Sequence, residues 1–166
     1  MNKLKGTAKS GFTLIELLVV IGIIGILAAV VLVAVNPGRQ FAQTRDTQRR
    51  SDLLQITNAI YQFAAEHDGN LPDTDNDDTT SNFPLTSTCI GSGGGCFDLG
   101  AAGSADGTDA DSLPDDPIVP TYIAAMPEDP STGITADTGY SVMVGADGRV
   151  VASASGELTT DISVQR

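Results

Sequence analysis

The sequence predicts an α+β protein in which one long, bent N-terminal helix carries a small C-terminal domain, giving a lollipop shape. Residues 12–35 are almost uninterruptedly apolar, and apolar residues recur at mostly helical spacing through residues 39–67. Residues 140–152 hold two short apolar runs around a glycine-rich turn, which indicates an antiparallel hairpin. We therefore expect four segments: a leader (1–11), a transmembrane or assembly helix (12–35), an amphipathic helix (36–68) and an acidic head domain (69–166).

The N-terminal segment combines a basic leader with an apolar run. Lys3, Lys5 and Lys9 are the chain's only lysines, and the leader holds no acidic residue. A helix over residues 12–35 would be roughly 36 Å long, enough to cross the hydrocarbon core of a membrane. A secretory signal peptide has a shorter run followed by an Ala-x-Ala-like cleavage site, which is not found here. A plain single-pass anchor is the stronger of the simple alternatives.

The helical pattern continues beyond a break. Asn36-Pro37-Gly38 interrupts the apolar run, and Pro37 predicts a kink because it lacks a backbone donor and crowds the preceding turn. The amphipathic helix should then extend to about His67, with Gly69 well placed to end it. Its upstream half is polar, so we expect that half to stay exposed or to meet other subunits. The apolar stripe comprises Phe41, Leu53, Ile56, Ile60, Phe63 and Ala64.

The head should be a small sheet with long loops. Residues 70–118 are rich in Asp, Thr, Ser and Gly and predict irregular structure. Tyr140–Val144 and Arg149–Ala152 should pair through the turn at residues 145–148, and Asp161–Val164 is a candidate third strand.

Charge and residue types argue against two classes of function. The formal net charge is −12, and the acidic region after residue 68 is a poor surface for nucleic acid, which requires clustered cations. The only histidine, His67, cannot complete a convincing Ser-His-Asp or Cys-His set. The run Gly91–Gly95 lacks the Lys-Ser/Thr that follows a phosphate-binding loop. We expect a protein that is not an enzyme and does not bind nucleic acid directly.

The two cysteines bracket a short glycine-rich loop. Cys89 and Cys96 are seven positions apart, which makes a ring between them easy to close. In an exported domain a disulfide is the natural state, while metal binding by two thiolates alone is weaker. Free thiols are the other alternative.

A run of aspartates raises the question of calcium. Asp73, Asp75 and Asp77 alternate like the first ligands of a calcium loop, and Asp78 adds a fourth carboxylate. Asp78 stands where an EF-hand has glycine and Pro84 where it has glutamate, so an EF-hand is excluded. A looser Ca²⁺ site, completed by carbonyls or distant aspartates, is one reading; an ordinary solvated acidic loop is the other.

Residues 9–20, KSGFTLIELLVV, carry a family resemblance. They resemble the class III leader of type IV pilins and of type II secretion pseudopilins. The resemblance implies that a prepilin peptidase cuts between Gly11 and Phe12 and methylates Phe12. It also places Glu16 at the fifth position of the mature chain, where the family has its characteristic glutamate. Residues 122–130, YIAAMPEDP, followed by Gly139-Tyr140, show a weaker resemblance to an element of many pseudopilins and small pilins.

Glu16 is a carboxylate inside an apolar run, which costs roughly 2.5–3.5 kcal/mol at the centre of a membrane helix. Cleavage would create a cationic amine on Phe12, and the resemblance implies that Glu16 of a neighbouring subunit pairs with that amine. Because an unpaired charge in an apolar core is costly, Glu16 would set register and docking. The simpler alternative is that Glu16 snorkels to the membrane surface, four positions inside the run.

These features together predict a structural protein: a prepilin of a type IV pilus-like filament, polymerised through its apolar helix. The expected partners are other subunits, the prepilin peptidase and methyltransferase, and an inner-membrane assembly platform. The expected location is the cell membrane, as a single-pass protein before assembly, and then the pilus filament or the cell surface or periplasm. A type II secretion pseudopilin is the main alternative, and a membrane-anchored binding module is a more distant one.

Overall fold

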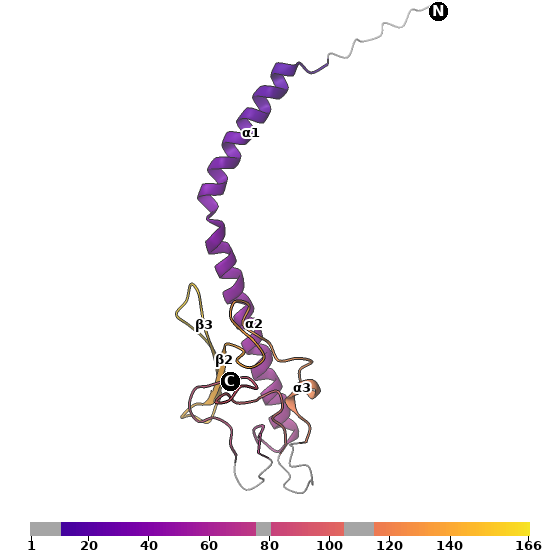
Figure 1. The fold of residues 1–166 in the computed structure, drawn as a ribbon, viewed down its shortest axis with the longest axis vertical. Coiled ribbons are helices and arrows are strands. Elements are labelled where there is room, and N and C mark those ends of the chain that lie inside the picture. Colours follow the sequence, from indigo (N-terminus) through magenta and orange to yellow (C-terminus); the bar gives the residue numbers. More distant parts are fainter. Residues whose placement is uncertain (1–10, 76–80, 105–114) are drawn as a thin grey trace, which may run out of the picture. The chain divides into compact units, whose positions relative to one another are not determined.

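The fold is described from a computed structural model, in which residues 11–75, 81–104 and 115–166 are placed. The chain divides into two compact units, residues 1–40 and residues 41–166. The order of elements is α1, α2, β1, α3, β2, β3 and β4 (Figure 1). A long helical segment is thus followed by a small antiparallel sheet, which confirms the predicted α+β class.

The N-terminal part of the chain is helical from residue 14 to residue 66, with one break inside the predicted interruption at residues 36–38. α1 spans Leu14–Val35 and α2 spans Pro37–Glu66. Between them Asn36 adopts a left-handed conformation (φ 46°), which Asn tolerates better than most residues. The break therefore lies one residue before the predicted kink at Pro37. Pro37 instead opens α2, where a missing N–H removes no helical hydrogen bond.

α2 ends close to where the sequence predicts. Its last residue is Glu66, and the Gly69 amide donates to the Ala64 carbonyl at 2.8 Å. Gly69 has a φ of 92°, a conformation that glycine adopts at no steric cost. The glycine thus closes the helix by capping one of its last carbonyl groups.

The four strands form one antiparallel sheet in the order β1-β2-β3-β4. β2 (Tyr140–Val144) and β3 (Val150–Ser155) pair with Tyr140 opposite Ala154 and Val144 opposite Val150. This is the predicted hairpin, and β4 (Asp161–Gln165) is the predicted third strand. The two-residue β1 (Thr88–Cys89) was not predicted, because it lies within the segment that reads as irregular.

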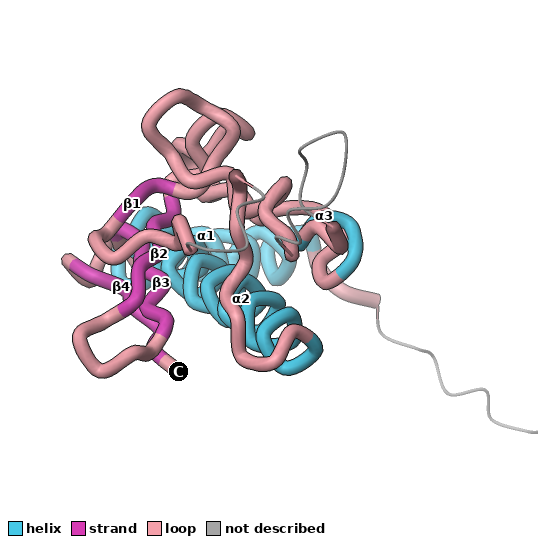
Figure 2. Tube along the Cα trace, turned by 90° about the horizontal axis from the view of Figure 1, so that it is seen from below, coloured by secondary structure: helices cyan, strands magenta, loops and turns pink. Residues whose placement is uncertain are grey.

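The hydrophobic core of the second unit lies between α2 and the sheet. From α2 it takes Leu53, Ile56, Ile60 and Phe63, all with at most 1% of their surface exposed. Alternate residues of β2 and β3, such as Tyr140 and Val142, complete it from the sheet. The short α3 (Ile118–Thr121) contributes the fully buried Ile118. In Figures 1 and 2 the sheet and α3 lie on different sides of α2.

The upstream half of α2 differs from the prediction. Phe41 is 63% exposed, and its neighbour Ala42 is the buried residue. Asp46, Arg49 and Asp52 are also buried, although the sequence predicts that this polar half stays exposed or meets other subunits. The error has a physical reason: partners distant in the sequence satisfy these charges, as described below.

Candidate assembly site

The predicted cleavage junction lies directly before α1. Gly11 and Phe12 are exposed and precede the helix, and Phe12 keeps 83% of its surface accessible. Thr13 is the N-cap of α1, in an extended conformation. A residue that can cap a helix at this position fixes where the helix begins, so the junction stays outside it.

Thr13 and Glu16 form a reciprocal capping box. The Glu16 amide donates to Oγ1 of Thr13 at 3.3 Å. In return Oε2 of Glu16 accepts from the Thr13 amide at 2.8 Å and from the Thr13 hydroxyl at 2.7 Å. The carboxylate is thereby held at the helix N-terminus, where the helix dipole favours a negative charge.

Glu16 has no oppositely charged partner among residues 11–75, 81–104 and 115–166. Within the described part of the chain, its carboxylate accepts hydrogen bonds from Thr13 alone, in the same turn of helix. The arrangement places a preoriented anion next to the end of the chain that cleavage at Gly11 would create. A cationic amine supplied from elsewhere is the natural complement of such a group.

α1 presents apolar surface around its whole circumference. None of its residues is buried, and most of its large side chains, such as Ile21, Ile26 and Val33, are more than half exposed. By length and composition it can cross a membrane: it has 22 residues and a mean hydropathy of 3.3. Such a helix needs lipid or other apolar helices around it, because exposed apolar area is unfavourable in water.

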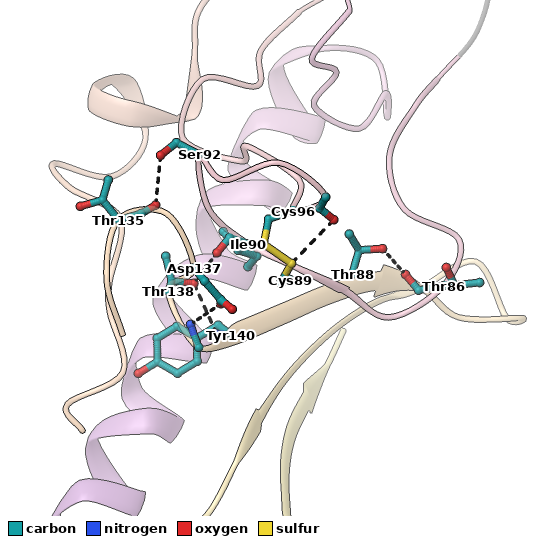
Figure 3. The surroundings of a disulfide bond; sticks show 12 residues. Thr86, Thr88, Cys89, Ile90, Ser92, Cys96, Thr135, Asp137, Thr138 and Tyr140 are labelled. Carbon is teal, nitrogen blue, oxygen red and sulfur yellow. Dashed lines mark hydrogen bonds between the residues drawn. A yellow bond between two sulfur atoms is a disulfide. The ribbon is translucent and has the colours of Figure 1, made fainter. Parts of the chain in front are cut away.

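Cys89 and Cys96 form a disulfide bond, with an S–S distance of 2.08 Å (Figure 3). The loop between them packs its backbone against residues 135 and 136. The Ser92 amide donates to the Thr135 carbonyl at 3.0 Å, and the Gly93 amide donates to the Ala136 carbonyl at 2.9 Å. A Cβ at Gly91 would lie 2.4 Å from the Ala136 carbonyl oxygen, so only glycine permits this approach.

A buried charged network that the sequence analysis missed surrounds Arg49 on α2. Its guanidinium is 3% exposed and contacts Asp129 through Nε at 2.5 Å and through Nη2 at 3.1 Å. Nη1 of Arg49 donates to Asp46 at 2.8 Å, and Nη2 also reaches Glu157 at 3.3 Å. These contacts hold the loop that contains Asp129 and the loop that contains Glu157 against one turn of α2. Asp46, Arg49, Asp129 and Glu157 are named together below as the Arg49 network.

Backbone donors complete the network. Asp46 accepts from the amides of Glu157 and Leu158 at 2.8 and 2.9 Å. These bonds, from Glu157 first and then Leu158, lower the pKa of Asp46 to about 2. A hydrogen bond from Arg45 lowers the pKa of Glu157 to about 2. Burial alone would raise the pKa of Asp129, but Arg49 and two loop amides outweigh burial and lower it.

A separate buried hydrogen bond joins Tyr140 to Asp52, one turn further along α2. The tyrosine hydroxyl group is buried and donates to Oδ2 of Asp52 at 2.7 Å. Burial, reinforced by Asp52, raises the pKa of Tyr140 well above its usual value. Since Asp46, Arg49 and Asp52 recur every three residues, one face of α2 carries all three. That face continues as Leu53, Ile56 and Ile60, so the stripe, extended upstream, reaches Arg49. This helical spacing was the signal in the sequence that could have placed Arg49 on the buried face of α2.

The candidate calcium ligands are only partly described. Asp73 is 3% exposed, and its two oxygens accept from the amides of Asp75 and Asn82 at 2.8 and 2.9 Å. Asp77 and Asp78 lie outside the described residues. Among the residues that are described, no group of three or more acidic, histidine or cysteine side chains is arranged to hold a metal. The calcium site stays a prediction.

Comparison with known families identifies one match, in the N-terminal segment. The family described as "Prokaryotic N-terminal methylation motif" matches residues 7–32, which include Gly11, Phe12 and Glu16. No curated protein and no solved structure matches the chain. The matched residues are the ones that form the capping box and most of α1. The N-terminal segment of the chain thus carries the prokaryotic N-terminal methylation motif, the class III leader found in type IV pilins and pseudopilins.

Proposed function

We propose that the protein is the prepilin of a type IV pilus-like filament. In this proposal prepilin peptidase cuts the chain between Gly11 and Phe12 and methylates the new terminus at Phe12. The leader leaves with all three lysines, and the mature chain is inserted in the membrane through α1. An inner-membrane assembly platform then moves subunits into a filament that reaches the cell surface.

The observation that carries the proposal is the position of Glu16. It is held at the N-terminus of α1 by Thr13, within hydrogen-bonding distance (2.7 and 2.8 Å), while α1 itself has no buried residue. In a filament core of packed apolar helices, the Phe12 amine of an incoming subunit would meet this carboxylate. The pair removes the cost of two isolated charges, so correctly registered subunits are favoured over misaligned ones.

The second element of the mechanism is α1. As a monomer in the membrane it is surrounded by lipid, and in a filament the same surface would be covered by the α1 helices of neighbours. Lipid and neighbouring helices are equally apolar, so extraction from the membrane exchanges one apolar environment for another. The carboxylate of Glu16 would then favour correctly placed subunits, because the amine of a neighbour neutralises its charge, which the hydrogen bonds from Thr13 do not.

A pseudopilin of a type II secretion system is the second candidate, supported by the weaker resemblance at Pro127–Pro130. Asp129, which belongs to that segment, binds Arg49 and accepts from three donors of residues 131 and 132. The residue thus has a structural role in the head, which either filament type can use. A membrane-anchored binding module remains the more distant alternative.

The proposal is tested by shearing cells that express the chain and examining the sheared fraction by electron microscopy and immunoblotting. Filaments that contain the protein are expected at the surface, and deletion of the prepilin peptidase should abolish them. If deletion of the gene stops protein secretion while no filament is found at the surface, the pseudopilin alternative holds. A protein that stays in the membrane fraction with its leader intact would contradict both.

A further inference from the structure

The head contains an apolar cavity with an acidic rim. Its volume is about 470 Å³, within the range of sites that hold a small ligand. Ile90, Val119 and Met126 are among its apolar lining residues, whereas Asp98 and Glu128 carry carboxylates. None of the described residues that line it is basic. The cavity therefore favours a group that combines apolar atoms with a positive charge, such as an arginine side chain.

The carboxylates of the cavity are not neutralised within the described part of the chain. Glu128 is exposed and accepts a hydrogen bond from the Thr135 hydroxyl at 2.9 Å. Asp98 is partly exposed and accepts from the Ala101 amide at 3.2 Å. Both bonds come from neutral donors. A cation entering the cavity would meet two acceptors that have no competing ion pair.

The complementary surface lies on the outer face of α2. Arg50 and Leu54 are four residues apart, so they are neighbours on the helix surface, and both are exposed. Arg50 forms no ion pair within residues 11–75, 81–104 and 115–166. The other arginines of the second unit (residues 41–166) are engaged: Arg45 and Arg49 with Glu157, Arg149 with Asp147, and Arg166 with Asn58.

We propose that Arg50 and Leu54 of one subunit pack into the cavity of the next, with the Arg50 guanidinium between Asp98 and Glu128. The apolar stem of Arg50 and the side chain of Leu54 would cover Ala125 and Met126, which are accessible apolar residues of the lining. This inference rests on the proposed filament function, which supplies the second copy. Because the two surfaces are different parts of the chain, the contact is heterologous and repeats along a filament instead of closing a dimer.

A charge swap in the full-length chain tests this contact. Arg50→Glu should reduce filament yield about tenfold or more, because it places three like charges together at the cavity. Glu128→Arg should weaken assembly for the same reason at the other surface. The double variant Arg50→Glu/Glu128→Arg should recover most of the yield. As a matched control, Arg149→Glu changes an exposed arginine outside both surfaces and should leave the yield unchanged.

Cysteine crosslinking gives an independent readout if a charge variant fails to fold. Arg50→Cys/Glu128→Cys in one chain should give a ladder of disulfide-linked subunits in oxidised filaments, whereas Arg50→Cys/Asp161→Cys should not. Normal filaments from Arg50→Glu together with no ladder would overturn the inference and leave the filament function standing. Absence of filaments from the wild-type chain would instead contradict the proposed function itself.

Discussion

Glu16 and Arg49 are both charged residues at places where an unpaired charge is costly, but their partners have different origins. The Arg49 guanidinium is 3% exposed and is paired within the chain, with Asp46, Asp129 and Glu157. Glu16 lies on an apolar helix without buried residues, and among the residues that the structure describes only Thr13 donates hydrogen bonds to its carboxylate. The charge of Arg49 is thus neutralised within a single subunit, whereas the exposed carboxylate of Glu16 can still accept a charged partner.

The difference separates a structural role from an assembly role. The Arg49 network holds the loops of residues 129 and 157 against α2. Removal of one member leaves the remaining charges without a partner, which is costly where they are buried. An incomplete site at the end of an apolar helix has little effect on the fold of the subunit. We therefore expect substitutions at Glu16 to affect polymerisation and substitutions at Arg49 to affect stability.

The largest expected effect is loss of filaments in Glu16→Val. Membrane insertion should be retained, since the change removes a costly charge from the span. Assembly should fall to background because the Phe12 amine of a neighbour is then unpaired in an apolar core. The sheared filament fraction measures this, with cleavage of the leader checked by mobility on a gel. Normal filaments from a cleaved variant would mean that Glu16 only snorkels.

Arg49→Met should have the opposite effect from Glu16→Val and lower the stability of the subunit. Loss of the guanidinium leaves Asp46 and Asp129 buried without their cation, which should cost about 3–5 kcal/mol in the free energy of unfolding. Thermal unfolding of the detergent-solubilised full-length chain, followed by circular dichroism, measures it. Arg149→Met is the matched control: its pair with Asp147 is exposed and spans 3.8 Å, so the expected loss is about 0–1 kcal/mol. Equal losses in the two variants would contradict a structural role specific to Arg49.

Removal of the disulfide should have an intermediate effect. The ring closed by Cys89 and Cys96 is short, so Cys89→Ser/Cys96→Ser should cost about 2–3 kcal/mol of stability by loop-closure entropy. The same unfolding experiment measures this loss. The wild-type chain should gain two hydrogens in mass on reduction. Stoichiometric labelling of free thiols in exported, non-reduced protein would exclude the bond.

Acid should weaken the Arg49 network. Asp46 and Glu157 have a pKa of about 2 in the folded chain, below the values of about 4 expected when it is unfolded. The unfolded chain binds protons first, so this stabilisation is complete above about pH 5 and is lost as pH falls from about 4 to 2. Melting temperature measured against pH should fall in this window. The fall should be shallower in Asp46→Asn, which removes one of the titrating groups.

Calcium should have the smallest effect, and it concerns the aspartates rather than the Arg49 network. If Asp73, Asp75, Asp77 and Asp78 bind Ca²⁺, millimolar calcium should raise the melting temperature by a few degrees, and a chelator should reverse the rise. Magnesium should substitute poorly, and Asp73→Asn/Asp75→Asn should abolish the shift. An unchanged melting temperature, with no heat of binding by calorimetry, would leave a solvated acidic loop.

The sequence was informative where contacts are local. The apolar span, the terminating Gly69 and the hairpin around residues 145–148 all depend on neighbours within a few positions. The Arg49 network was not predicted because Asp129 and Glu157 lie 80 and 108 residues further along the chain. A charged residue was therefore taken as exposed, although it occupies the buried face of α2. Pairing of the short β1 depends in the same way on a strand about fifty residues later.

The N-terminus of the subunit in purified filaments tests the central claim most directly. Filaments sheared from cells would be dissociated, digested and examined by tandem mass spectrometry for the first residue of the mature chain. The account predicts N-methylated Phe12 as the first residue and no peptide from residues 1–11. A retained Met1, or a start near residues 30–40 at the end of the apolar run, would contradict assembly through α1 and Glu16.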